Sequence, residues 1–91
     1  MNLQDTIYNW LSIKVVANER QDDQAAQDTY EFFHQILTED HQVSDLHVEV
    51  SQEYYIVRYR RNGEEDSKKF PVELIEALLT SIENEPKYNH Q

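Results

Sequence analysis

Hydrophobic residues near the start of the chain recur at the spacing of an amphipathic helix. The periodic segment runs from about Leu3 to Ala17, and Asn2 or Asp5 can cap it by accepting bonds from free amide groups. A β-branched cluster near its end lowers helix propensity, but the spacing still predicts a helix. The residues that fall close to one stripe are Leu3, Ile7, Trp10, Leu11, Lys14 and Val15.

A second amphipathic helix is expected after the polar connection 18–23. Asp22 or Asp23 can cap its first turn, and the helical spacing continues to about Glu39. Its apolar face comprises Ala26, Tyr30, Phe33 and Leu37, and it is widened by Thr29 and Ile36.

After His41 the pattern changes to the alternation that is typical of half-buried strands. The segment Tyr54–Arg61 is rich in β-branched and aromatic residues and predicts a second strand. Asn62-Gly63 is the dipeptide preferred in type I′ hairpin turns, so a third strand should follow over Glu64–Phe70. The alternating apolar residues of the first strand are Leu46, Val48 and Val50.

The two turns that join these strands predict one consistent register. An even turn centred on Gln52-Glu53 and the Asn62-Gly63 turn bring the apolar residues of all three strands to one face, which predicts a meander. The expected pairs are Arg61–Glu64, Arg60–Glu65, Tyr59–Asp66, Val57–Lys68, Tyr55–Phe70, Val50–Tyr55, Val48–Val57 and Leu46–Tyr59.

The last segment predicts a third helix and completes the fold class. Pro71 suits a first helical turn, and Pro86 should end the helix. We therefore expect a single α+β domain over 1–86, with helices on one face of a three-stranded antiparallel meander, and a polar tail over 87–91. Phe33 should be buried where the second helix meets the sheet. The apolar residues of the third helix are Ile75, Leu78, Leu79 and Ile82, with Val72 and Leu74 adding width.

The composition excludes several classes of protein. The 91 residues include no cysteine, which excludes disulfides, thiol nucleophiles and thiolate metal sites. No apolar run is long enough to span a membrane, and no secretion signal is visible, so we expect a cytoplasmic protein. A formal net charge of −10 opposes a general phosphate-binding surface and favours a basic partner.

The polar residues do not form a recognised catalytic motif. His34 and His41 lie seven residues apart and could join Glu31 and Asp45 in a metal site, but compact ligand spacing is lacking, and incidental surface histidines are the better interpretation. The serines lack the glycine-flanked setting of a nucleophile elbow. We therefore expect no catalytic residue, no metal and no cofactor.

Charge is distributed unevenly along the chain. Five of the eight basic residues lie in the predicted hairpin 54–70, and Arg58, Arg60 and Lys69 point to the sheet face opposite the core. That face could bind nucleic acid or an acidic peptide, although a solvated face with cross-strand charge pairs is the preferred interpretation. The acidic residues that gather around the second helix are Glu19, Asp22, Asp23, Asp28, Glu31 and Asp40.

Two segments of the chain, Asp28–Phe33 and Phe70–Leu79, resemble small uncharacterised cytoplasmic proteins of Bacillus-type bacteria. The similarity covers the second and the last helix and consists of packing patterns, not of catalytic signatures. What the resemblance implies is an unknown function, with no activity, ligand or site to transfer.

The leading hypothesis is a non-enzymatic interaction module, a bacterial cytoplasmic regulator or adaptor with a basic protein partner. A related form is a nucleic-acid mimic that occupies a DNA-binding protein, and the alternative is direct nucleic-acid binding through the basic sheet face. Tyr54 and Ile56 on that face, with Tyr8 and Trp10 on the first helix, exceed what one small core holds, so a weak homodimer through either surface is expected. The candidate partner-binding residues are Asp22, Asp23, Asp28, Glu31, Arg58, Arg60 and Lys69.

Overall fold

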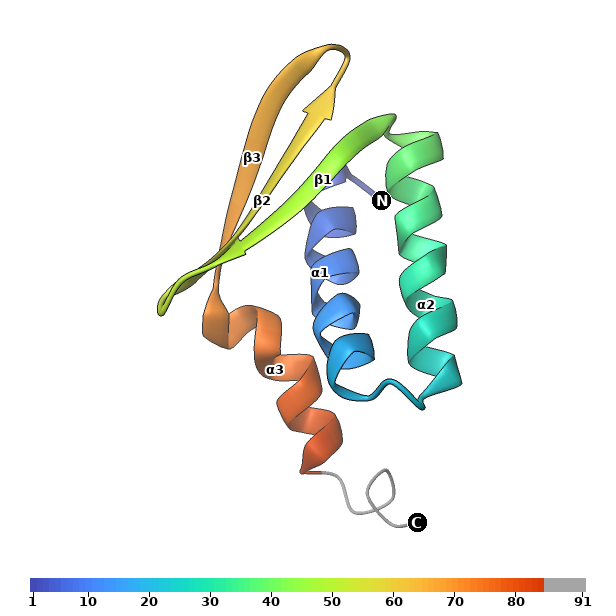
Figure 1. Ribbon diagram of the computed structural model, residues 1–91, viewed down its shortest axis with the longest axis vertical. Coiled ribbons are helices and arrows are strands. Elements are labelled where there is room, and N and C mark those ends of the chain that lie inside the picture. Colours follow the sequence, from blue (N-terminus) through green and yellow to red (C-terminus); the bar gives the residue numbers. More distant parts are fainter. Residues whose placement is uncertain (85–91) are drawn as a thin grey trace.

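A computed structural model describes residues 1–84 and confirms the predicted α+β class. The order of elements is helix, helix, three strands, helix, and the strands form one antiparallel sheet in the order β1-β2-β3 (Figure 1). The elements are α1 (Leu3–Glu19), α2 (Gln24–Gln35), the π-helical turn η1 (Ile36–Asp40), β1 (Val43–Val50), β2 (Tyr54–Arg61), β3 (Glu64–Pro71) and α3 (Val72–Glu83).

Helix α1 begins at the cap that the sequence offers and extends two residues beyond the expected end. The Asn2 side chain accepts a hydrogen bond from the amide of Asp5 at 2.7 Å. The helix packs against the sheet through residues such as Ile7 and Leu11, which are almost completely buried. Trp10 is also buried, at 2 % exposure, so the expectation that it stays available for self-association is wrong.

Helix α2 packs mainly against α1. Asp23 caps it, since the carboxylate accepts from the amide of Ala26 at 3.1 Å. Phe33 is only half-buried, and the expectation that it fills the junction between helix and sheet is therefore wrong. The π-helical turn η1 makes that contact instead, because it touches β1 and holds the fully buried Leu37. Thr29, expected to widen the apolar face, is exposed.

The strand pairing follows the predicted register almost throughout. All five expected pairs between β2 and β3 are observed, as are Val48–Val57 and Val50–Tyr55 between β1 and β2. Asn62 and Gly63 have φ values of 56° and 81°, the left-handed conformations that a type I′ turn requires.

One predicted pair, Leu46 with Tyr59, is altered by a β-bulge. Ser44 pairs with Arg60 and His47 with Arg58, so two residues of β1, Asp45 and Leu46, lie opposite Tyr59. Asp45 takes the positive φ of the extra residue, at 53°. The bulge reverses the alternation upstream of it and turns Val43 into the core, where it is 2 % exposed.

Helix α3 starts directly after Pro71, which is the last residue of β3 and has an extended ψ of 140°. The prediction that Pro71 lies in the first helical turn is therefore wrong by one position. Ile75 is fully buried, whereas Leu74 and Leu78 are 46 % and 41 % exposed. The helix ends at Glu83. The predicted stop at Pro86 and the predicted polar tail 87–91 lie outside the described residues.

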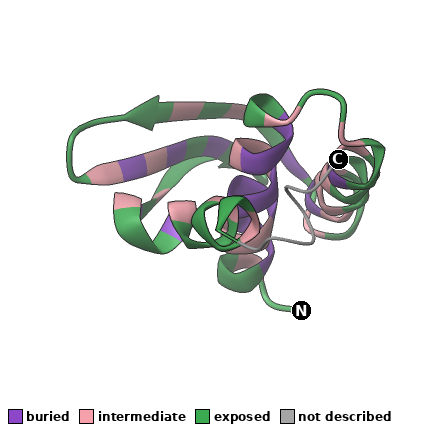
Figure 2. Ribbon diagram, turned by 90° about the horizontal axis from the view of Figure 1, so that it is seen from below, coloured by how far each residue is buried: buried purple, intermediate pink, exposed green. Residues whose placement is uncertain are grey.

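The core forms where α1, η1 and α3 meet the inner face of the sheet. Buried positions alternate with less buried ones along most of β2 (Figure 2). Val50 has the expected inward register, yet it is 62 % exposed because it lies at the end of the sheet. Within residues 1–84, none of the helices combines the length and the apolar character needed to cross a membrane.

Candidate interaction surfaces

The acidic residues around the second helix form one exposed region of the molecule, which we call the acidic surface. Positions 21–40 contain six carboxylates and neither lysine nor arginine. All six are exposed except Asp23, which caps α2 and lies 3.4 Å from the Arg20 guanidinium. The members of the acidic surface are Asp22, Asp23, Asp28, Glu31, Glu39 and Asp40.

An aromatic side chain stands among these carboxylates. Phe32 is 58 % exposed and meets Phe33 edge-on, with ring centroids 5.3 Å apart. Asp28 and Glu39 lie four residues before it and seven after it, on the same helical face. A small hollow of about 180 Å³ beside Phe32 extends to Asp40.

Sequence reasoning did not select Phe32 as a functional residue. The signal was present in the adjacent pair Phe32-Phe33, because neighbouring residues of a helix cannot both lie on its narrow apolar face. The helical stripe assigned Phe33 to the core and left Phe32 on the polar side. Phe32 therefore lies exposed beside Glu39 and Asp40.

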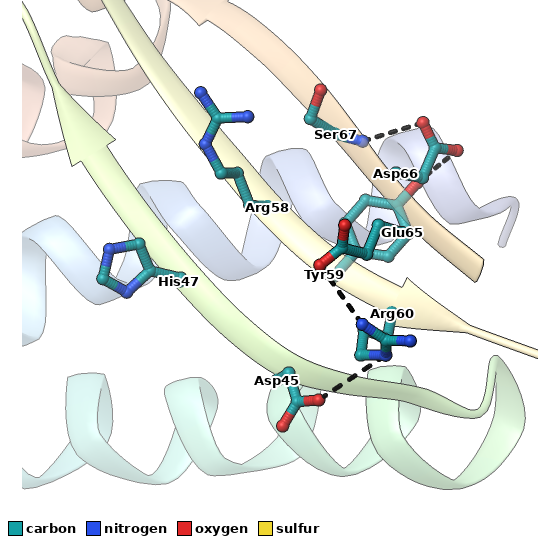
Figure 3. A pocket seen from close by; sticks show the side chains of 8 residues that line it. All are labelled: Asp45, His47, Arg58, Tyr59, Arg60, Glu65, Asp66 and Ser67. Carbon is teal, nitrogen blue, oxygen red and sulfur yellow. Dashed lines mark hydrogen bonds and ion pairs between the residues drawn. The ribbon is translucent and has the colours of Figure 1, made fainter. Parts of the chain in front are cut away.

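The basic residues of the hairpin lie together on the outer sheet face, as predicted. Figure 3 shows Arg58 and Arg60 together with acidic side chains from the neighbouring strands. Lys69 lies on the same face, because it pairs with Ile56 in the register of β2 and β3. Arg58 donates to Glu49 at 2.7 Å. Arg60 lies 3.2 Å from a carboxylate oxygen of Glu65 and 4.0 Å from one of Asp45.

Lys69 is engaged differently, because its ammonium lies 4.2 Å from the centre of the Tyr54 ring. Such cation–π contacts hold the charge over the aromatic face. Each of the three predicted basic residues therefore has an internal partner.

The ion pairs also change the titration of the residues involved. The hydrogen bond from Arg58 holds the pKa of Glu49 below its usual value, and the same bond raises the pKa of Arg58. The pKa of Asp66 is lowered by the Ser67 amide and the Tyr59 hydroxyl, which both donate to the carboxylate. The outer face is hollowed by about 550 Å³ over these residues, and its charges are largely neutralised from within.

The histidines lie apart from one another. His34 accepts from the indole Nε1 of Trp10 at 3.3 Å if its Nδ1 is unprotonated, and its ring stacks on Tyr30. His41 lies 3.4 Å from the Thr6 hydroxyl, and His47 is on the outer sheet face. In the part of the chain that the structure describes, no three histidine, aspartate or glutamate residues could hold one metal ion. His90 lies outside that part.

The fold and these surfaces were compared with known proteins. No family model, no curated protein and no solved structure matches the chain. The functional argument therefore depends on the surfaces alone.

Proposed function

We propose that this protein is a non-enzymatic interaction module, a cytoplasmic regulator or adaptor, whose acidic surface docks a basic protein partner. One observation carries the proposal: Phe32 is exposed in the middle of a region that holds six carboxylates and no lysine or arginine. The unbalanced charge and the aromatic anchor occur at the same place.

The two features supply different parts of recognition. Unpaired surface charge attracts a partner of opposite charge and accelerates encounter, an effect that salt screens over about 8 Å at physiological ionic strength. A buried aromatic anchor supplies affinity, since a few central residues dominate most interfaces. Phe32 would enter an apolar pocket of the partner while Asp28 and Glu39 meet lysine or arginine beside it.

The nucleic-acid alternative uses the outer sheet face and has weaker support. Arg58 and Arg60 would exchange internal carboxylate partners for phosphates, and Lys69 would leave the Tyr54 ring. The net charge of −10 opposes the approach of a polyanion at long range. The mimic hypothesis, in contrast, uses the acidic surface itself and specifies the partner as a DNA-binding protein.

A pull-down from bacterial extract tests the proposal with two matched variants. The first replaces Asp28, Glu31, Glu39 and Asp40 by their amides, and the second replaces Glu49, Glu53, Glu64 and Glu73 by glutamine. Both lose four negative charges, but only the first changes the acidic surface. We expect the first variant to lose a salt-releasable basic protein that the second retains. Equal retention by both variants, or recovery of nucleic acid instead, would contradict the proposal.

Weak self-association through the outer sheet face remains part of the proposal. Tyr54 and Ile56 are half-buried there, whereas Trp10 is buried and no longer supports a dimer through α1. Sedimentation at increasing concentration should show a mass that rises above 10.9 kDa. A constant mass would exclude the homodimer without affecting the acidic surface.

A further inference from the structure

A groove separates β1 from α1 and α3, on the side of the sheet that faces the helices. It encloses about 570 Å³. Its walls come from four elements, α1, β1, β2 and α3. Apolar lining is supplied by Val15, Val48, Val50 and Leu79, and carboxylates are supplied by Glu19 and Glu76.

The groove lies beside a free strand edge. The strand order β1-β2-β3 makes β1 and β3 the two edges of the sheet. Edge strands are commonly protected from pairing by lysine, proline or a bulge. β3 carries Lys68, Lys69 and Pro71, whereas β1 has a bulge near its start and neither lysine nor proline along its length. The part of β1 that forms the groove, from His47 to Val50, is regular.

Negative charge is concentrated at one end of the groove. Glu19 lies in the last turn of α1 and Glu83 in the last turn of α3, and neither turn contains a basic residue. Helix C-termini already carry partial negative charge, and cations are the residues that stabilise them. Together with Glu76, the Glu19 carboxylate at the C-terminus of α1 therefore gives the groove a negative lining that suits a cationic ligand.

Among the described residues, two cations near the groove make contacts of their own. The ammonium of Lys14, on the groove wall, lies over the rings of Trp10 and Tyr30 toward α2. Arg20, which follows α1, reaches Asp23. Burial and the negative charges of Glu76 and Glu19 raise the pKa of Tyr55 to about 12. The Tyr55 hydroxyl donates to Glu76 at 2.7 Å and so fixes that carboxylate in the groove.

We propose that the groove binds an extended basic segment of a partner protein, which pairs with the free edge of β1. Its apolar side chain lies against Val50 and Leu79, and its lysine or arginine lies beside Glu76 and Glu19. Strand addition obtains affinity from main-chain hydrogen bonds and specificity from pockets for alternate side chains. This inference rests on the proposed function, because it assigns a second contact to the same basic partner.

A second copy of this chain does not fit the groove. Its net charge is −10, and the lysines and arginines of its outer sheet face already have internal partners. The basic hairpin of a second copy keeps one free edge, on β3, and Lys68, Lys69 and Pro71 hinder strand pairing at that edge. Charge complementarity therefore favours a different protein.

Fluorescence anisotropy with synthetic peptides tests the inference on the full chain. The probe is a fluorescein-labelled nonapeptide of alternating leucine and lysine, and its control replaces lysine by glutamate. A third peptide carries N-methyl groups on alternate residues, which removes main-chain donors and leaves the side chains in place. We expect binding of the first peptide only. Equal binding of the N-methylated peptide would overturn strand addition.

Variants of the protein locate the site. Val50→Lys, at an exposed position, gives β1 the kind of charge that protects β3. It should weaken the binding of the probe peptide roughly tenfold or more. The double variant Glu19→Gln with Glu76→Gln keeps an oxygen acceptor for the Tyr55 hydroxyl. It should weaken the binding of the probe peptide to a similar degree. The control pair Glu64→Gln with Glu73→Gln makes the same change in net charge away from the groove and should leave binding unchanged. Circular dichroism confirms that each variant is folded.

The outcomes separate the groove from the acidic surface. If groove variants bind the probe as tightly as the control pair does, the inference is overturned while the acidic surface keeps its own test. If the groove variants lose the probe and the acidic-surface variant retains it, the groove is confirmed as the peptide site. Loss of the probe only in the acidic-surface variant would overturn the groove and support the proposed function.

Discussion

The outer sheet face and the acidic surface are both rich in charged residues, but the charges are paired on the first and unbalanced on the second. On the sheet, Arg58 and Arg60 lie within ion-pair distance of carboxylates that come from neighbouring strands. On α2 and η1, carboxylates follow one another along the helix with no lysine or arginine among them. The charges of the outer sheet face are paired with one another, and the acidic surface keeps an excess of negative charge.

The difference follows from the geometry of the two kinds of element. Cross-strand register sets residues from different parts of the sequence side by side, so a strand of arginines can be matched by a strand of glutamates. A single helix presents only residues three and four positions apart as neighbours, and here none of those neighbours is lysine or arginine. The Asp28 carboxylate, for example, accepts from the side-chain amide of Gln24 at 2.8 Å. The net charge of the chain is consequently expressed most strongly on α2 and η1.

The largest expected effect on stability comes from truncating Leu37, the buried residue beneath the acidic surface. Leu37 is fully buried in η1 and joins this segment to the core, so Leu37→Ala should lower the free energy of unfolding by about 2–5 kcal/mol. Phe32→Ala, a few residues away and 58 % exposed, should change it little. Urea denaturation measures both, and similar losses would show that Phe32 belongs to the core.

A smaller effect is expected at the turn that sets the register of the outer sheet face. Gly63 has a φ of 81°, and nothing lies within 4 Å of an added Cβ, so Gly63→Ala suffers only the conformational penalty. That penalty is about 1–2 kcal/mol. Thermal unfolding should show a corresponding decrease in stability. An unchanged transition would mean that the turn tolerates another conformation.

Alkaline titration distinguishes the sheet tyrosines from the remaining ones. Burial and the neighbouring carboxylates Glu76 and Asp66 raise the pKa values of Tyr55 and Tyr59 to about 12 from an ordinary value of 10.0. A raised pKa stabilises the folded state fully below pH 10 and loses that contribution between about pH 10 and 12. Ultraviolet absorbance of tyrosinate should therefore show a late phase that coincides with unfolding. A single phase at the ordinary pKa would contradict the burial of these hydroxyl groups.

The smallest effect is expected for the exposed pair of Arg58 and Glu49. Because the pKa of Glu49 is lowered, the pair stabilises the fold above the ordinary carboxyl pKa and loses this contribution as pH falls through the lowered value. Glu49→Gln should therefore reduce stability slightly at neutral pH and low salt, and the difference should vanish in acid and in high salt. A difference that persists at low pH would point to a role other than charge pairing.

Local patterns predicted most of the fold. Helical periodicity, the Asn2 and Asp23 caps and the Asn62-Gly63 turn identified the elements and nearly all strand pairs, because each depends on residues close in sequence. The bulge at Asp45 was missed, since a left-handed aspartate has no periodic signal, and Val43 was therefore not assigned to the core. Packing between elements was also missed: α2 covers α1, so Phe33 is half-buried and Leu37 reaches β1.

The candidate surfaces were predictable to different degrees. The acidic residues and the outward direction of Arg58, Arg60 and Lys69 follow from sequence spacing. The exposure of Phe32 and the groove beside Val50 depend on where helices stop covering their neighbours, which is a property of the assembled fold. Neither feature can be predicted from the spacing of residues along the chain.

A photo-crosslinking residue placed at Phe32, and in a second protein at His47 on the outer sheet face, tests the central claim most directly. Both positions are exposed, so both variants should fold. After illumination in bacterial cells, we predict an adduct between position 32 and a protein of net positive charge, and no comparable protein adduct from position 47. The yield of the adduct from position 32 should fall as the salt concentration rises. An adduct with protein or nucleic acid from position 47 alone would contradict the assignment of the acidic surface as the docking site.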